Sequence, residues 1–371
     1  MLDHELMRPP MITQTAMRSD LPPVPAEDLQ RSFEHLPEAI WRELDGRRIY
    51  ITGGTGFLGK WLLATLLDVR RRLDMQCTVT VLSRRPEAFM SAMPMLATAP
   101  GVTLVKGDVC TVEPDGCHYD TVIHAATDVI APNTPRETFD TCVEGTRRAL
   151  AIASASGARD FLLVSSGAVY GRQPADMDRV PEGFCGAPDP LVPSSAYGEG
   201  KRVAEWLSCT GGADAGFDVK IARCFAFVGP HLPLDKHFAI GNFLSAALDR
   251  RDLVIQGDGS PVRSYLYAAD MAGWLWAVLL RGAHARAYNV GASEGLSIAE
   301  LASTVCKALD LELPVHVLTP RAHDVPAQRY VPDNSRARLE LDLPVPIPLA
   351  EAIARTACWH RHLLTNGGGR P

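Results

Sequence analysis

Two features are scarce in this chain: long hydrophobic runs and an excess of charge of one sign. No segment has about 18 uninterrupted apolar residues, as a transmembrane helix requires, so a membrane partner is not expected. The N-terminus carries Asp3 and Glu5 and has no apolar h-region, which argues against a secretory signal peptide. The net charge is only −6 and the one basic run is Arg70–Arg72, so nucleic acid is not expected as a partner either.

The nine cysteines are an odd number, and no two of them form a Cys-x-x-Cys pair. This pattern argues against a disulfide framework and a zinc site, and it predicts reduced thiols in a cytoplasmic protein. His231, Asp235 and His237 cluster in one predicted loop, but their spacing is weak evidence for a metal. We expect no metal site, and we interpret the three residues as structural or as positioning a substrate loop.

The first 45 residues are predicted to form an extension outside the main fold. Residues 1–25 are rich in proline and polar residues without periodicity, so most of them are expected to be disordered. From Ala26 to Leu44, apolar residues recur at three- and four-residue spacing, which predicts an amphipathic helix that Pro37 interrupts. The sequence leaves open whether this helix packs on the body of the protein or on a partner subunit.

From Arg47 onward, segments rich in Val, Ile and Leu alternate with segments of helical length. Buried parallel strands have this composition because both of their faces are covered. The alternation predicts an α/β fold: a Rossmann-type, doubly wound parallel sheet with a smaller, partly interleaved C-terminal domain. We assign 46–225 and 262–292 to the sheet domain, and 226–261 and 293–365 to the smaller one. The expected strands are Arg47–Thr52, Cys77–Ser83, Val102–Lys106, Thr121–His124, Asp160–Ser165 and Asp218–Arg223. The expected helices are Leu58–Leu73, Phe139–Ser156, Ala196–Cys209, Phe238–Arg250 and Ser297–Leu309, and Trp274–Leu280 is expected in a buried helix.

A glycine-rich turn joins the first expected strand to the first long helix. Gly54–Gly59 satisfies G-x-G-x-x-G, with Gly53 in front of it. Glycine allows a tight turn and a close approach of the backbone to a pyrophosphate, and the amides of the following helix point at the anion. A glycine-rich turn without a ligand is the alternative. The strand-turn-helix context favours a dinucleotide site.

The end of the second strand bears on the choice of cofactor. An acidic residue there would bind the adenosine ribose of NAD, whereas the chain has Ser83-Arg84-Arg85. An arginine can accommodate a 2′-phosphate, so NADP is favoured over NAD, although two exposed arginines would look the same. Asp108, after the third strand, either contacts the adenine or caps the local backbone.

Two further motifs contain candidate catalytic residues. "FLLVSSGAVYG", from Phe161 to Gly171, is a buried strand that ends in two serines, and "SSAYGEGK" places Tyr197 and Lys201 four residues apart. On a helix these two side chains share a face. The nearby ammonium favours the phenolate, so Tyr197 could take the proton of a substrate hydroxyl while hydride leaves to a nicotinamide. A serine hydroxyl at the strand end would hold the substrate oxygen.

With these motifs, the chain resembles the extended short-chain dehydrogenase/reductase family, and within it the nucleotide-sugar epimerase/dehydratase branch. The resemblance covers about Arg47 to Leu343 and rests on "TGGTGFLG", "GDV", "VIHAAT", "VEGTRRALAIA", "VSSGAVYG", "YGEGK", "RCFAFVGP" and "GDGSPVRSYLYAADMA". It implies a nucleotide-diphosphate sugar as substrate and a homodimer built through a four-helix bundle.

The resemblance also implies roles for individual residues. It gives Ser166, Tyr197 and Lys201 as the catalytic set, with Lys201 also on the nicotinamide ribose. The implied NAD(P)(H) contacts are Gly53, Gly56, Phe57, Leu58, Gly59, Ser83, Arg84, Asp108, Val109, Ala125, Ala126, Tyr197 and Lys201. The implied substrate contacts are Thr127, Ser165, Asn242 and Arg263; structural roles for Asn242 and Arg263 stay open.

Three departures from the family pattern narrow the expected reaction. Gly167 and Ala168 stand where dehydratases carry acidic residues and where decarboxylases carry a glutamate nearby. Cys142 and Ala226 stand where the family often has asparagine. Elimination of water needs an acid and a base, which this strand end does not supply. The sequence therefore predicts oxidation or reduction at a sugar carbinol, at C4, by an epimerase or a ketoreductase. A 4,6-dehydratase and an NADPH-dependent reductase of a non-sugar carbonyl are the alternatives.

Overall fold

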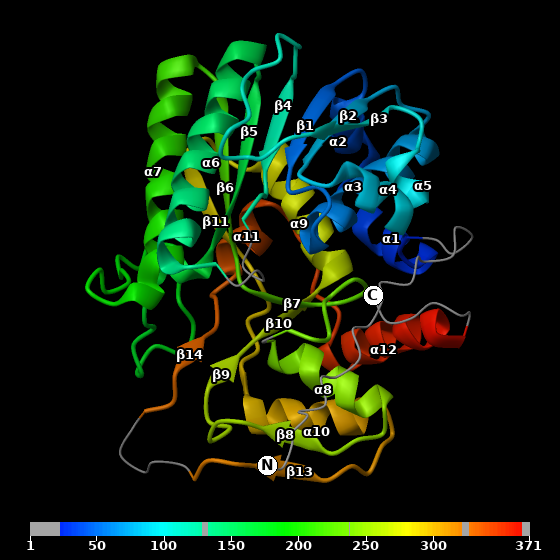
Figure 1. The fold of residues 1–371 in the computed structure, drawn as a ribbon, viewed down its shortest axis with the longest axis vertical. Coiled ribbons are helices and arrows are strands. Elements are labelled where there is room, and N and C mark those ends of the chain that lie inside the picture. Colours follow the sequence, from blue (N-terminus) through cyan, green and yellow to red (C-terminus); the bar gives the residue numbers. More distant parts are fainter. Residues whose placement is uncertain (1–22, 128–132, 237, 321–325, 366–371) are drawn as a thin grey trace, which may run out of the picture.

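The computed structural model describes residues 23–127, 133–236, 238–320 and 326–365. Most of residues 1–25, for which disorder is predicted, lie outside the described residues. His237 of the predicted loop cluster also lies outside them. At the centre of the structure is a seven-stranded parallel sheet in the order β11-β6-β5-β4-β1-β2-β3 (Figure 1). This order is that of a doubly wound fold, so the predicted fold class is confirmed.

The strands of this sheet begin and end close to their predicted bounds. Their residues are largely buried on both faces, as parallel strands require. The sequence reading did not name the last strand, β11, which pairs with β6. The strands are β1 (Arg48–Thr52), β2 (Thr78–Ser83), β3 (Val102–Lys106), β4 (Thr121–His124), β5 (Asp160–Ser166), β6 (Asp218–Cys224) and β11 (Arg286–Val290).

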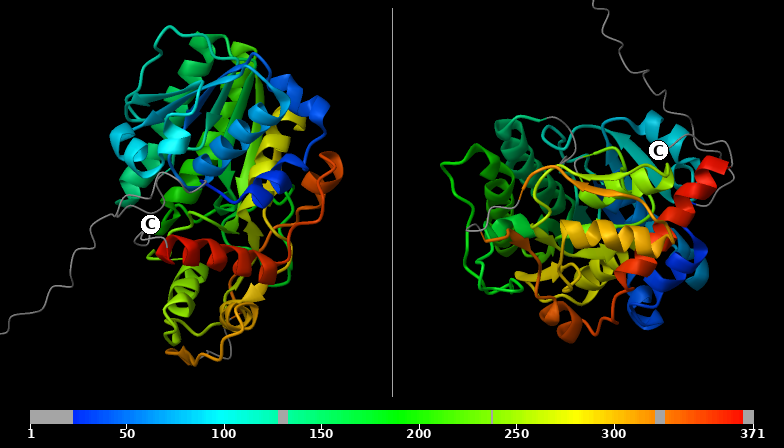
Figure 2. Two further views of the ribbon diagram at one scale, coloured as in Figure 1. Left: turned by 90° about the vertical axis from the view of Figure 1, so that its right-hand side faces the viewer. Right: turned by 90° about the horizontal axis from the view of Figure 1, so that it is seen from below.

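Helices cover both faces of the sheet. One face packs against α6 and α7, and the other packs against α3 and α9, so the two helical layers lie on opposite sides of the molecule (Figure 2). The segment Trp274–Leu280 lies in α9 and is almost wholly buried, as predicted. These helices are α3 (Phe57–Leu73), α4 (Pro86–Ala92), α5 (Pro94–Ala97), α6 (Pro135–Ser156), α7 (Ala196–Ala215) and α9 (Ala268–Arg281), with the short helices η2 (Gly167–Tyr170) and η3 (Pro193–Ser195).

A smaller region lies beyond the carboxyl ends of the strands, in the lower half of Figure 1. It holds three small sheets, β7 with β10, β8 with β13, and β12-β9-β14. Its strands are β7 (Ala226–Val228), β8 (Leu253–Ile255), β9 (Val262–Arg263), β10 (Tyr265–Tyr267), β12 (Leu296–Ser297), β13 (Val315–Val317) and β14 (Arg329–Tyr330). Its helices are α8 (Ala239–Leu248), α10 (Ile298–Ala308) and α12 (Leu349–Thr365), and α11 (Ser335–Glu340) returns to pack against β11.

The N-terminal extension packs on the body of the protein. It consists of α1 (Ala26–Phe33), α2 (Glu38–Trp41) and η1 (Arg42–Leu44), and Pro37 separates the first two helices as predicted. Arg31 pairs with the buried Asp270 of α9 at 2.8 Å, and the Trp41 ring meets Trp276 of α9 at 6.0 Å between centroids. The amphipathic face of this extension is therefore buried within its own chain.

Within the part of the chain that the structure describes, no helix combines the length and the apolar character needed to cross a lipid bilayer.

Candidate active site

The glycine-rich turn forms a tight crossing between β1 and α3. Gly53 has φ +74°, and a Cβ atom there would lie 2.6 Å from the Ala125 carbonyl carbon. A Cβ atom at Gly59 would lie 2.3 Å from the Gly53 oxygen. Gly56 precedes α3 as its N-cap and offers no side-chain cap, so the amides of Phe57 and the next residues stay available at the positive end of the helix. This arrangement fits the pyrophosphate of a dinucleotide.

The other predicted cofactor contacts lie at the carboxyl ends of the neighbouring strands. Leu58 belongs to the first turn of α3. Ser83 is buried at the end of β2, and its hydroxyl accepts a hydrogen bond from the Arg85 amide at 3.2 Å, while Arg84 is exposed. Asp108 accepts from the Cys110 amide at 2.8 Å, which is the capping role that the sequence left open for it.

The segment after β4 runs beside the glycine turn. The Ala125 amide donates to the Thr52 carbonyl at 3.1 Å, and the Ala126 amide lies 3.3 Å from the Thr52 hydroxyl. Thr127 donates its hydroxyl to the Ala126 carbonyl at 2.8 Å. Val109, after β3, packs close to α6. These predicted contacts therefore line one edge of the sheet.

The predicted catalytic residues meet at the end of β5. Ser166 is the last residue of that strand, and Tyr197 and Lys201 lie on the first turns of α7. Hydrogen bonding from the nearby Ser166 side chain lowers the pKa of the Tyr197 phenol, against the larger effect of burial. The Lys201 Nζ atom is 6.0 Å from the centre of the Tyr197 ring and donates to the Val164 carbonyl at 2.7 Å. A substrate hydroxyl placed between Ser166 and Tyr197 would face both groups.

Burial shifts the titration of this set. It raises the pKa of the Tyr197 phenol, which the hydrogen bond from Ser166 lowers in part. It also lowers the pKa of the Lys201 ammonium. Both shifts favour neutral groups, so a positive charge bound beside Tyr197 would be needed to hold the phenolate.

Ser165 is not brought together with these residues. Side chains alternate along a strand, and the Ser165 hydroxyl donates to Glu205 at 2.6 Å. Glu205 also pairs with Arg223 at 2.7 Å. The Ser165 side chain therefore belongs to a buried polar cluster, which differs from its predicted contact with substrate.

The two predicted diphosphate contacts lie in the smaller region. Asn242 is exposed on α8. Arg263 is partly buried on β9, donates to the Val262 and Gln328 carbonyls, and makes no salt bridge to any described carboxylate. Burial lowers its pKa. A partly buried guanidinium that lacks an acidic partner in the described chain suits an anionic ligand.

Two residues near the site, Tyr330 and His124, were not predicted. The Tyr330 hydroxyl on β14 lies 3.3 Å from Ser166 Oγ, and the Tyr330 ring packs on Phe225 at 4.6 Å. His124 is buried at the end of β4, where its Nδ1 lies 2.8 Å from the Thr52 hydroxyl. Burial and the Lys201 charge lower the pKa of His124 to about 3. No local sequence pattern could indicate the contact between Tyr330 and Ser166, because 164 residues separate them in the chain.

The two cysteines near the set are buried thiols. Cys142 of α6 lies against Gly200, where a Cβ atom would be 2.7 Å from the Cys142 Cβ atom. Burial raises the pKa of Cys142, and it raises the pKa of Cys224 on β6 to about 12. Both are therefore protonated at neutral pH. Ala226, the other departure from the family pattern, lies in β7 opposite Tyr265.

His231 of the predicted loop cluster has a structural role. His231 is buried, stacks edge-on against Trp359 at 4.7 Å, and hydrogen-bonds the Pro23 carbonyl. Among the described residues, no group of three His, Cys, Asp or Glu side chains is placed to hold a metal ion. Asp235 pairs with Lys236 at 3.0 Å.

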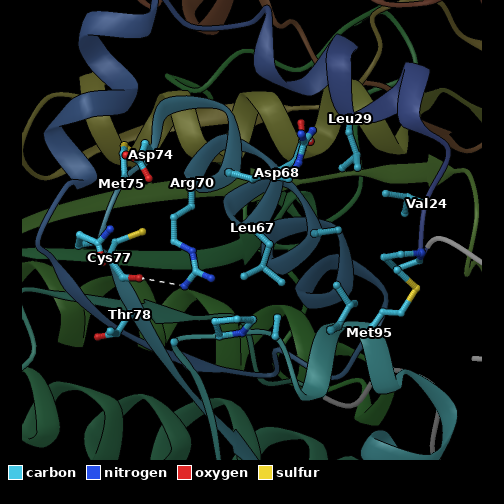
Figure 3. Close-up of a pocket in the computed structure, with 18 of the residues that line it drawn as sticks. Val24, Leu29, Leu67, Asp68, Arg70, Asp74, Met75, Cys77, Thr78 and Met95 are labelled. Atoms are coloured by element: carbon cyan, nitrogen blue, oxygen red, sulfur yellow. Dashed lines mark hydrogen bonds and ion pairs between the residues drawn. The ribbon is translucent and has the colours of Figure 1, made fainter.

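A cavity of about 730 Å³ lies between the extension and the α3 side of the sheet, away from the predicted catalytic set (Figure 3). Leu29, Leu67 and Met95 contribute apolar walls, and Arg70 reaches across to the Cys77 carbonyl at 3.3 Å. None of Ser166, Tyr197 and Lys201 lines this cavity.

Sequence comparison identifies relatives over most of the chain. Residues 49–291 match the family described as "NAD dependent epimerase/dehydratase family". UDP-glucuronic acid decarboxylase 1 of Arabidopsis thaliana is 32% identical over 322 residues, which cover 86% of this chain and 71% of that protein. UDP-glucuronic acid decarboxylase 1 of Xenopus tropicalis is 30% identical over 341 residues, which cover 90% and 77%.

Solved structures share the fold. A UDP-glucose 4-epimerase of Thermotoga maritima, solved with UDP-glucose, has a TM-score of 0.70 at 20% identity, over 85% of this chain and 99% of that chain. A dTDP-glucose 4,6-dehydratase of Streptomyces venezuelae, solved with NAD, has a TM-score of 0.70 at 24% identity, over 85% and 97%.

These matches confirm the resemblance to the epimerase/dehydratase family that the sequence motifs indicated. The cofactor of the matched family is NAD, and the predicted preference for NADP finds no support in the comparisons. The family match covers well over half of the chain, and relatives at 30% identity or more cover over two thirds of it. The chain therefore belongs to the NAD-dependent epimerase/dehydratase family of nucleotide-sugar enzymes.

Proposed function

We propose that the protein oxidises a nucleotide-diphosphate sugar at its C4 hydroxyl with NAD, and that it returns the hydride to give a C4 epimer or works in reverse as a ketoreductase. Ser166, Tyr197 and Lys201 meet at the end of β5, at the same carboxyl edge of the parallel sheet as the glycine turn after β1, and this arrangement is the observation behind the proposal. NAD, held by the turn and the uncapped start of α3, would accept the hydride from C4.

The residues of this chain would supply the proton chemistry. Tyr197 would take the proton of the C4 hydroxyl, and Ser166 would hold the same oxygen by donating a hydrogen bond. Lys201 donates one hydrogen bond to the Val164 carbonyl, which leaves two N–H groups that can reach toward the phenol and the ribose. Arg263 would pair with the diphosphate.

The two residues that follow Ser166 favour oxidation and reduction at C4 over the elimination of water. A Cβ atom at Gly167 would lie 2.5 Å from the Phe225 ring, so this position has no room for an acidic side chain. Ala168 contributes a methyl group, and its amide donates to Ser166 at 3.1 Å. This geometry disfavours a 4,6-dehydratase of the common type, which needs an acid and a base there.

Decarboxylation is the second candidate, because the sequence relatives are UDP-glucuronic acid decarboxylases. Oxidation at C4 of a uronic acid gives a β-keto acid, which can lose carbon dioxide without a further acidic residue. The same three residues could therefore begin either reaction, and the substituent at C5 would decide the outcome.

Product analysis separates these reactions. The purified protein is incubated with NAD and, in turn, UDP-glucose, UDP-glucuronate and dTDP-glucose, and the products are resolved by chromatography with mass spectrometry. An isomer of unchanged mass supports epimerisation, loss of carbon dioxide supports decarboxylation, and loss of water supports dehydration. Tyr197→Phe should bind NAD but lose turnover, and turnover that survives this change would rule out the proposed base.

Two measurements settle the cofactor and the substrate class. Denaturing the purified protein and identifying the released dinucleotide tells NAD from NADP; Ser83 and Arg84 are the residues that would favour NADP. Affinity for UDP alone tests Arg263, since a reductase of non-sugar carbonyls has no need for a diphosphate site. A protein that binds no dinucleotide would contradict the whole proposal.

We also expect a cytoplasmic homodimer. All nine cysteines are free, as in a reducing compartment. The outer helical layer of α6 and α7 is the surface through which the family resemblance implies dimerisation, and Trp206 of α7 is 65% exposed on it.

A further inference from the structure

Tyr330 reaches the site from a distant part of the chain, and its position is well defined by packing. It ends β14, which pairs in parallel with β9, so that Tyr330 lies in register with Arg263. The next residue, Val331, is buried, and its amide donates to Gln173 at 3.0 Å. The Tyr330 ring packs on Phe225, with 4.6 Å between centroids. The Tyr330 hydroxyl is thereby held 3.3 Å from Ser166 Oγ.

The hydrogen-bonding capacity of Ser166 fixes the direction of this contact when Tyr197 is ionised. A serine hydroxyl has one donor and two acceptor sites. The Ala168 amide fills one acceptor site at 3.1 Å. A Tyr197 phenolate can only accept, so it takes the single Ser166 proton. The one site that remains is an acceptor, and Tyr330 can occupy it only by donating.

Tyr330 remains a donor throughout the working range of pH, because burial raises its pKa to about 12. While Tyr197 is neutral, the Tyr330 hydroxyl also has the Cys224 carbonyl as an acceptor at 3.4 Å. Ionisation of Tyr197 therefore favours one ordered chain of donors, from Tyr330 to Ser166 to Tyr197.

We propose that Tyr330 is a positioning residue of the active site, which donates a hydrogen bond to Ser166 and thereby directs the single Ser166 proton into the site. In the NAD-loaded protein without substrate this proton goes to the phenolate oxygen of Tyr197, and once the sugar is bound it goes to the C4 oxygen. This inference rests on the proposed function, in which Tyr197 is the base. It adds a residue of the smaller region to a set that otherwise comes from β5 and α7.

Tyr330→Phe tests the hydroxyl alone, because it keeps the ring that packs on Phe225 and lies 5.8 Å from the Arg263 guanidinium carbon. Tyr170→Phe is the matched control. Tyr170 is a buried tyrosine of the same aromatic cluster, and its hydroxyl donates to Asn289 at 2.8 Å, away from Ser166. A loss that follows merely from removing a buried phenol hydroxyl would appear in both variants.

The main readout is the ionisation of Tyr197 in the NAD-loaded protein, which requires no substrate. Absorbance is titrated from about pH 6 to about pH 11, and the same titration of Tyr197→Phe is subtracted. The charged or titratable groups facing Tyr197 are Lys201, Cys142, Cys224 and Tyr330. We expect Tyr330→Phe to raise the transition by roughly 0.7 pH units, the equivalent of one hydrogen bond, and Tyr170→Phe to leave it in place.

A double-mutant cycle tests whether Tyr330 acts through Ser166. Once Ser166→Ala has removed the middle of the chain, adding Tyr330→Phe should shift the Tyr197 transition no further. With an active substrate, Tyr330→Phe should lower kcat several-fold and leave KM nearly unchanged. Equal transitions in the wild type and Tyr330→Phe, additive shifts in the double variant, or no Tyr197 transition in the wild type would each overturn the inference. Absence of turnover with every nucleotide sugar would contradict the proposed function instead, and the titration would still decide the role of Tyr330.

Discussion

Charge at the site is controlled residue by residue through burial. The Tyr197 phenol and the Lys201 ammonium are both shifted toward their neutral forms. His124, behind them, stays neutral because its pKa is lowered to about 3. Any charge that the reaction creates on Tyr197 must therefore be balanced by groups only a few ångströms away, and Lys201 is the cation that the chain itself supplies.

Lys201→Met is expected to move the pH dependence of sugar oxidation upward. Tyr197 must lose its proton to act as a base, so kcat/KM should rise with pH until the phenolate forms. Without the ammonium the phenolate is less stable, and the rising limb shifts to higher pH. Lys201→Arg keeps the charge and should retain a limb close to that of the wild type. The pH profile of kcat/KM checks this, and a limb that stays in place in the methionine variant would assign the base to another group.

His124 should make the fold sensitive to acid. Its pKa is about 3 in the folded protein and about 6.5 when unfolded, so between these values the unfolded state binds the extra proton. Stability should fall as the pH drops below about 6.5. His124→Asn, which keeps a partner for Thr52, should reduce this slope in thermal unfolding measured from about pH 7 to about pH 4. An equal slope in both proteins would assign the acid sensitivity elsewhere.

Among the elements, α1 is tied to the body by buried charge. Asp28 is fully buried, accepts from the Tyr267 hydroxyl at 2.5 Å, and pairs with Arg355 of α12 at 2.8 Å. Asp28→Ala leaves both partners without this carboxylate and should lower the free energy of unfolding by about 3 kcal/mol. Glu27→Ala, at the exposed neighbour, is the control and should change it little. Urea unfolding compares the two, and equal effects would show that α1 is held by its apolar face alone.

The glycine turn between β1 and α3 is an element in which backbone contact replaces side chains. A Cβ atom at Gly59 would lie 2.3 Å from the Gly53 oxygen, whereas one at Gly116 would meet no atom within 4 Å. Gly59→Ala should displace the start of α3 and weaken NAD binding at least about tenfold, or about 1.4 kcal/mol. Gly116→Ala, at a left-handed glycine far along the chain, controls for loss of a glycine in general. Calorimetric titration with NAD measures both, and unchanged affinity in Gly59→Ala would place the dinucleotide elsewhere.

At the scale of the whole molecule, α6 and α7 form an outer layer that a second copy could cover. Trp206 of α7 is 65% exposed there, and a large aromatic side chain in that position is typical of an interface. Trp206→Arg should convert a homodimer into a monomer in analytical ultracentrifugation. Leu339 of α11 is 82% exposed on another surface, so Leu339→Arg should leave the assembly intact. A monomeric wild type would contradict the dimer.

Local pattern was sufficient to predict much of this molecule. The strands and the glycine turn follow from burial and backbone geometry, which depend on neighbours in the chain, and the i, i+4 spacing of Tyr197 and Lys201 places both on one helix face. The same alternation along β5 that brings Ser166 to the site turns Ser165 away toward Glu205. The sequence predicted roles for both Ser165 and Ser166. The register of β5 within the sheet determines which of the two side chains faces the site.

The amino-acid sequence by itself determined the doubly wound fold, the glycine turn and the Ser166, Tyr197 and Lys201 set, because each depends on short-range periodicity or on residues carried by one or two adjacent elements. Only the tertiary structure decided that the extension packs on α9, that Phe225 fills the space beside Gly167, and that Tyr330 meets Ser166. Contacts of this kind join residues far apart in the chain, and they form only when the elements that carry these residues pack against each other.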